Sequence, residues 1–106
     1  MTKNKVVKQD YKLLGTLFSA CSLNDIVYAL EQQGWQRLTP DEECERLSFN
    51  GLNLRCEGHG SMLVELTFSG EVDSVQPFFN CIDTLPVSYS LDLFGDSARL
   101  VRRFIR

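Results

Sequence analysis

The sequence lacks the features of a membrane-spanning or exported chain. No run of apolar residues approaches the roughly 20 that a membrane-spanning helix needs. The polar first ten residues are followed by no apolar segment of roughly 7 to 15 residues, so the sequence predicts no secretory signal. We therefore expect a protein of the cytoplasm that makes no contact with a membrane.

Length and composition set the size of the domain. With 106 residues, 43% of them apolar and 24% charged, the chain has the composition of a globular protein and room for one core. We expect residues 1–9 to form a disordered basic lead-in and residues 10–106 to form a single α+β domain.

Histidine is scarce, and the cysteines are far apart. The chain has four cysteines and no C-x-x-C pair: Cys21, Cys44, Cys56 and Cys81. Because no export signal is predicted, we expect all four thiols to be reduced. Cys56 and the only histidine, His59, make half of a ligand set, whereas zinc takes about four ligands. We predict no metal and no cofactor. Cys21 precedes an expected helix, but its apolar neighbours favour a core or boundary thiol over a nucleophile.

Recognisable catalytic motifs are missing as well. The sequence has no Ser/His/Asp order, H-E-x-x-H, P-loop or G-x-G-x-x-G. An enzyme would have to work with carboxylates alone, and these cluster at Asp41, Glu42, Glu43 and Glu45. A solvated helix N-terminus explains such a cluster, because the helix dipole favours negative charge there. We therefore expect no enzyme.

Charge is distributed unevenly along the chain, whose formal net charge is −3. Residues 1–12 carry +3, residues 13–96 carry −10 and residues 97–106 carry +4. The acidic body disfavours binding to nucleic acid, because it repels a phosphate backbone. It favours instead a protein partner, and a basic one in particular.

The first half of the domain combines a strand and a helix. Residues 11–20 fit either a buried strand or a helix, and we favour the strand because a clear helix start follows. That helix is expected from Leu23 to Gln33, with Ser22 as N-cap, and Gly34 able to end it. Thr39 and Pro40 open a second, short helix that extends to about Cys44.

The second half begins with the strongest β pattern. Alternating apolar residues on both sides of Asn50-Gly51 predict a hairpin that places Phe49 opposite Leu52, and a third strand follows the Gly-His-Gly turn. Helical spacing from Ser74, the expected N-cap, to Leu85 predicts a second full helix. Residues 87–93 alternate again and predict a strand.

The last ten residues fit two structures. Gly95-Asp96 permits a hairpin, but as a strand the segment would carry arginine on both faces. As a helix, the segment would have four arginines on one side and apolar residues on the other, and we therefore predict a terminal helix. The four arginines are Arg99, Arg102, Arg103 and Arg106.

The expected fold is therefore α+β, with element order β-α-(short α)-β-β-β-α-β-α. We predict an antiparallel sheet of about four to five strands with two to three helices on one face. In element order alone, the core resembles the ferredoxin-like β-α-β-β-α-β arrangement with an extra strand.

By elimination, the sequence predicts a small non-catalytic intracellular protein-binding domain of the immunity, adaptor or regulatory type. Its binding residues would be the acidic cluster and the C-terminal arginines: Asp41, Glu42, Glu43, Glu45, Arg99, Arg102, Arg103 and Arg106. The alternative is a ligand-sensing module of the dimeric ferredoxin-like kind, with a pocket at Ser19 to Leu23. A small enzyme that uses carboxylates comes third. Trp35 is expected to pack against the helix end, whereas an exposed Trp35 would indicate an interface anchor.

Overall fold

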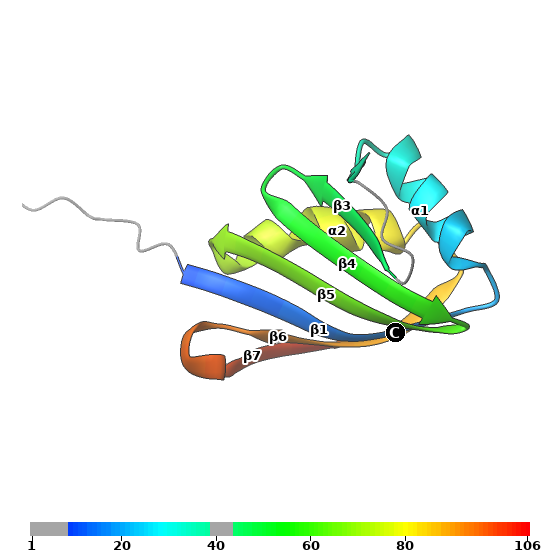
Figure 1. Ribbon diagram of the computed structural model, residues 1–106. Helices are drawn as coiled ribbons and strands as arrows, with labels where there is room; N and C mark the ends of the chain where they lie inside the picture. The colour runs from blue at the N-terminus through cyan, green and yellow to red at the C-terminus, as the bar shows by residue number, and fades with distance from the viewer. Residues whose placement is uncertain (1–8, 39–43) are drawn as a thin grey trace, which may run out of the picture.

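A single antiparallel sheet dominates the computed structural model, which describes residues 9–38 and 44–106. Within these residues seven strands lie in the order β2-β3-β4-β5-β1-β6-β7 (Figure 1). The strands are β1 (Gln9–Ser19), β2 (Gln36–Arg37), β3 (Glu45–Phe49), β4 (Leu52–His59), β5 (Ser61–Gly70), β6 (Val87–Phe94) and β7 (Leu100–Ile105). The helices are α1 (Leu23–Gln32) and α2 (Gln76–Ile82), with short 3-10 turns η1 (Val72–Val75) and η2 (Asp96–Ala98).

The hydrophobic core lies between one face of the sheet and the two α-helices. Leu13 and Leu17 of β1 are buried there, while Leu14 and Phe18 between and beside them are exposed, as the two-residue period of a strand requires. The helices contribute Ile26, Val27 and Leu30 of α1 and Phe78, Phe79, Cys81 and Ile82 of α2. Both helices therefore cover the same side of the sheet.

Several predicted elements are confirmed. Residues 11–20 lie almost entirely in the strand β1. The hairpin pairs Phe49 with Leu52, and Asn50 and Gly51 have the positive φ angles that their tight turn needs. Ser22 caps α1 as predicted, in a capping box with Asp25.

The end of α1 also follows the prediction. Gly34 has a φ of 104°, and the Trp35 N–H donates to the Leu30 carbonyl at 3.1 Å, which closes the last turn. Trp35 is buried, stacks on Phe49 and donates through Nε1 to the Cys81 Sγ at 3.3 Å. The alternative interpretation of Trp35 as an exposed interface anchor is therefore wrong.

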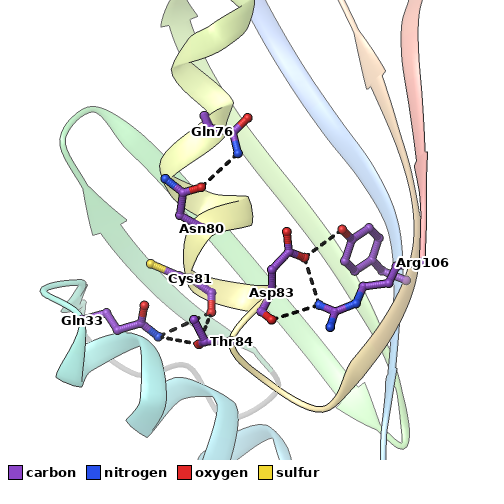
Figure 2. Close-up of polar contacts among 8 residues, drawn as sticks. Gln33, Gln76, Asn80, Cys81, Asp83, Thr84 and Arg106 are labelled. Atoms are coloured by element: carbon purple, nitrogen blue, oxygen red, sulfur yellow. Dashed lines mark hydrogen bonds and ion pairs between the residues drawn. The ribbon is translucent and has the colours of Figure 1, made fainter.

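Polar contacts join the two helices at their C-terminal ends. Gln33 Nε2 donates to the Thr84 Oγ1 at 3.3 Å, and the Thr84 hydroxyl donates to the Cys81 carbonyl at 2.7 Å (Figure 2).

The predicted N-cap of the second helix, Ser74, is wrong, because η1 precedes α2 and Val75 occupies the N-cap. Among the described residues, the helices are all too short to cross a membrane.

The predicted fold class is wrong. The structure is mostly sheet, with seven antiparallel strands and two α-helices in its described part, instead of four to five strands and two to three helices. The two-residue strand β2 is too short for a periodicity to reveal. Residues 1–8 of the predicted lead-in, and residues 39–43 of the predicted short helix, lie outside the described residues.

The predicted terminal helix is a strand, β7, for a reason that lies in β6. Without β7, β6 would leave a long row of backbone groups unpaired at the sheet edge. Arg106 and Tyr89 exchange both backbone hydrogen bonds, at 3.0 and 3.2 Å. Phe104 stacks on Phe79 of α2, with ring centroids 4.3 Å apart. An edge strand also tolerates arginine on both faces, the property that favoured a helix in the sequence.

Candidate binding surface

One face of the sheet carries neither α-helix. Cross-strand pairing puts Thr16 of β1 beside Leu63 of β5 and Ser90 of β6, and puts Ile105 of β7 beside Ser90. Paired side chains share a face of the sheet, and Leu17, the next residue after Thr16, lies in the core. The row from Leu63 to Ile105 therefore points away from the helices. We call this side the uncovered face.

Register assigns the remaining members of the uncovered face. They are Gln36 of β2, Asp10, Lys12, Leu14, Thr16 and Phe18 of β1, Arg46 and Ser48 of β3, Asn53, Arg55, Glu57 and His59 of β4, Ser61, Leu63, Glu65, Thr67 and Ser69 of β5, Ser88, Ser90, Asp92 and Phe94 of β6, and Arg103 and Ile105 of β7.

Large apolar side chains are exposed on this face. Leu14 is 37%, Phe18 46% and Leu63 59% exposed. Leu63 lies diagonally between the other two, because its partner Thr16 separates them on β1. Phe18 has the short side chains of Ser61 and Ser88 beside it. Leu14 lies between Glu65 and Asp92, and Leu63 lies between Thr16 and Glu57. Leu14, Phe18 and Leu63 form what we call the apolar patch, and Ile105, 71% exposed, lies beyond it at the sheet edge.

The charges around the apolar patch balance. The uncovered face has four basic residues, Lys12, Arg46, Arg55 and Arg103, and four acidic residues, Asp10, Glu57, Glu65 and Asp92. Lys12 Nζ lies 3.8 Å from the Glu65 Oε2. The Arg103 Nε donates to the Asp92 Oδ1 at 2.7 Å, and this hydrogen bond lowers the pKa of Asp92. The face therefore combines an apolar centre with little net charge.

The helix layer carries the acidic surface instead. Asp25 and Glu31 lie on α1, and Asp73 lies on η1. Residues 23–32 and 71–83 contain no lysine or arginine. This side of the molecule is where a basic partner would find complementary charge.

Of the predicted acidic cluster, only Glu45 lies within the described residues. Asp41, Glu42 and Glu43 lie outside the described residues. Glu45 accepts hydrogen bonds from the Arg37 Nε at 2.8 Å and Nη2 at 2.9 Å. The pKa of Arg37 is raised by this hydrogen bond and by the charge of Glu45. The bidentate pair already occupies Glu45 within its own chain.

The predicted arginine stripe is dispersed in the structure. Arg103 lies on the uncovered face, whereas Arg102 lies over the Phe104 ring on the opposite side, with its guanidinium carbon 4.8 Å from the ring centroid. Arg99 follows η2. Because β7 is a strand, neighbouring arginines point to opposite faces and do not form one stripe.

Arg106 ties the end of β7 to the connection between α2 and β6. Its Nη1 donates to the Asp83 Oδ1 at 3.0 Å and to the Asp83 carbonyl at 3.2 Å, as Figure 2 shows. The Tyr89 hydroxyl donates to the same Oδ1 at 2.9 Å. Burial, and then the hydrogen bond to Asp83, raise the pKa of Tyr89. This network fixes the edge strand against the body of the domain.

Two hollows adjoin the ends of the uncovered face. A groove of about 890 Å³ lies near the start of β1, and Tyr11, Leu14, Phe68 and Phe94 give it an apolar lining. A second hollow of about 670 Å³ lies at the other end and is lined in part by Ser22, Leu23, Glu57 and His59. Ser22 and Leu23 belong to the segment at which the sequence placed a ligand pocket.

The structure separates Cys56 from His59, the two residues that make half of a metal-ligand set in the sequence. Cys56 pairs with Val64 and is buried in the core, whereas His59 pairs with Ser61 and points to the uncovered face. In the described part of the chain, no three His, Cys, Asp or Glu side chains come together as metal ligands. Burial, aided by the charge of Glu45, raises the pKa of Cys56 to about 12.

Native-state alkylation should distinguish Cys21 from Cys56. Only a thiolate reacts, and a pKa of about 12 in place of about 9 lowers the thiolate fraction of Cys56 at pH 8 roughly a thousandfold. Cys21 is partly exposed. Brief iodoacetamide treatment followed by peptide mass spectrometry should therefore find label on Cys21 and almost none on Cys56, while in urea both should react. Equal labelling of the two in the native protein would contradict the buried position of Cys56.

Sequence reasoning missed the apolar patch, although a signal for it was present. Strand segments with two consecutive apolar residues, such as Leu13-Leu14 and Met62-Leu63, place one apolar side chain on each face. Alternation alone hides the second side chain, because the first already accounts for the core.

Comparisons with protein-family models, curated proteins and solved structures found no significant match for this chain. Its function is therefore inferred from the uncovered face and the apolar patch.

Proposed function

We propose that this chain is a non-catalytic protein-binding domain that docks a partner protein on the uncovered face of its sheet. The observation that carries the proposal is the apolar patch, in which Leu14, Phe18 and Leu63 are 37 to 59% exposed on a face that neither helix covers. Interface centres are typically apolar or aromatic with a polar rim. The uncovered face has this arrangement.

The partner surface should be apolar at its centre and carry little net charge. A strongly charged partner gains nothing from a face with four basic and four acidic residues, since attraction to one set is offset by repulsion from the other. Charges of both signs around an apolar centre instead favour a partner that places an opposite charge against each of them.

Photo-crosslinking would test the proposal. A photo-reactive amino acid in place of Leu63 should capture one partner in cells, whereas the same amino acid in place of Tyr28, 64% exposed on α1, should not. With the purified partner, Leu63→Glu should weaken binding at least about tenfold, because it places a charge at the centre of the interface, from which water is excluded. Tyr28→Glu is the matched control and should leave the affinity within about twofold.

Two results would contradict this assignment. Equal losses of affinity for Leu63→Glu and Tyr28→Glu would show that the partner does not read the uncovered face. A concentration-dependent dimer that Leu63→Glu abolishes in sedimentation would assign the face to a second copy of the chain.

A ligand-binding module is the second candidate, favoured by the groove of about 890 Å³ at the start of β1. Its volume falls in the range of small-molecule sites, and Tyr11 and Phe68 supply stacked aromatic rings 5.1 Å apart. Saturation-transfer NMR with a small-molecule library decides between the two: binding abolished by Thr67→Trp, which fills the groove, would favour the ligand module.

The cellular setting completes the proposal. We place the protein in the cytoplasm, on the basis of its four cysteines, which form no disulfide in the structure. The acidic helix layer leaves room for a basic protein to bind on the side opposite the uncovered face.

A further inference from the structure

The outer edge of β7 offers backbone groups for a further strand. β7 is the last strand of the seven-stranded order and has β6 as its only described neighbour. Arg106 exchanges both of its backbone hydrogen bonds with Tyr89. In an antiparallel ladder the bonded pairs alternate, so Phe104 also bonds inward, while Arg103 and Ile105 turn their N–H and C=O groups outward. These outward groups are the template on which an extended peptide could pair.

The charge along this edge selects the partner. Arg103 pairs with Asp92 and Arg106 pairs with Asp83, but the Arg103 side chain stays 57% exposed and accessible to a further carboxylate. Arg99 and Arg102 form no ion pair with another described residue. The edge is therefore positively charged. Pairing of β7 with a second β7 would set arginines against arginines, which is unfavourable. An acidic strand would instead gain charge-assisted contacts.

We propose that β7 receives an extended acidic segment of a partner protein, which adds to the sheet as an eighth strand. Main-chain hydrogen bonds to Arg103 and Ile105 hold the segment, and its carboxylates face Arg102 on the helix side and Arg103 on the uncovered face. Because these two arginines are adjacent and point to opposite sides, the segment has two neighbouring acidic residues at its centre. This inference deepens the proposed protein-binding function, but it concerns the sheet edge and not the apolar patch.

The probe is a capped eight-residue peptide of threonine and valine with two adjacent glutamates at its centre. In NMR titrations of the intact chain, the amides of Arg103 and Ile105 should shift and become protected from hydrogen exchange. Affinity should fall as salt rises, since the contact is between charges. A matched peptide with lysines in place of the glutamates should bind at least about tenfold more weakly.

Ile105→Pro tests the backbone directly. Proline removes the outward N–H of residue 105 and spares the inward bonds of β6 with β7, which is why edge strands tolerate it. We expect at least a tenfold loss of affinity for the acidic peptide, whereas Ile105→Ala, the control for the lost side chain, should change it less than about twofold. Leu63→Glu should leave peptide binding unchanged, so failure here is distinguishable from failure of the docking face.

Two results of the peptide titrations would overturn the proposal. Absence of amide shifts at millimolar acidic peptide would overturn the proposal and leave the arginines as charges that only prevent self-pairing of the edge. Equal binding of the acidic and basic peptides would also overturn it. If Ile105→Pro fails to fold, the exchange protection of Arg103 and Ile105 in the unaltered chain decides the question by itself.

Discussion

Replacing Phe78 by alanine should lower the free energy of unfolding by about 3 to 5 kcal/mol. Phe78 is fully buried on α2, and its ring meets Trp35 edge-on with centroids 6.2 Å apart and Phe79 with centroids 5.4 Å apart. Alanine would leave a cavity between the helix layer and the sheet that these large rings cannot close. A loss of this size is a large fraction of the total stability of a small domain.

Phe18→Ala is the matched control for this result. Phe18 is 46% exposed on the uncovered face, so its truncation should cost less than about 1 kcal/mol. Urea denaturation followed by circular dichroism measures both variants, with the midpoint and slope fitted together. Equal effects of the two substitutions would mean that the core does not lie on the helix side of the sheet.

Gly15→Ala should destabilise the domain by about 3 kcal/mol, through overpacking and not through a cavity. A Cβ atom at this position of β1 would lie 2.0 Å from the Ser90 carbonyl oxygen and 2.8 Å from the Leu91 Cα. Both are backbone atoms of β6, so no side-chain rotation can make room. β1 would have to move away from β6, which it pairs with from Lys12 to Ser19.

Thr16→Ala provides the control for Gly15→Ala. Thr16 is the next residue of β1 and points to the uncovered face, so its truncation should change stability by less than about 1 kcal/mol. Thermal and urea unfolding of both variants measures the difference. A Gly15→Ala variant as stable as Thr16→Ala would show that β1 and β6 are not packed as closely as the structure has them.

Gly15 also bears on function, because β7 is joined to the sheet through β6 alone. A variant that separates β1 from β6 should weaken binding of the acidic peptide at the edge as well as stability. By contrast, substitutions in the apolar patch should alter docking and leave stability nearly unchanged. This difference would separate the structural residues of the sheet from the residues of the proposed docking face.

Much of the central sheet and α1 could be predicted because local features specify them. The Asn50-Gly51 turn sets the hairpin register by itself, since both residues accept a positive φ. Ser22 and Asp25 mark the start of α1, and Gly34 marks its end. These signals act between residues only a few positions apart.

The contacts of the predicted site residues could not be predicted in the same way. Glu45 was grouped with its acidic neighbours, but the structure pairs it with Arg37, eight residues earlier. The arginines of β7 were placed on one side, but Asp92 and Asp83 hold two of them at different positions. These contacts depend on which strands become neighbours in the sheet.

The sequence by itself determined the alternation of β4, β5 and β6, the hairpin turn and the caps of α1, because periodicity and backbone preferences are properties of neighbouring residues. Only the tertiary structure decided that Leu100 to Ile105 form a strand and that Leu14, Phe18 and Leu63 stay exposed. The first depends on the unpaired edge of β6, and the second on both helices packing against the same side of the sheet. In both cases, hydrogen bonds and packing with residues distant in the sequence decide the structure, and the local preferences of the segment do not.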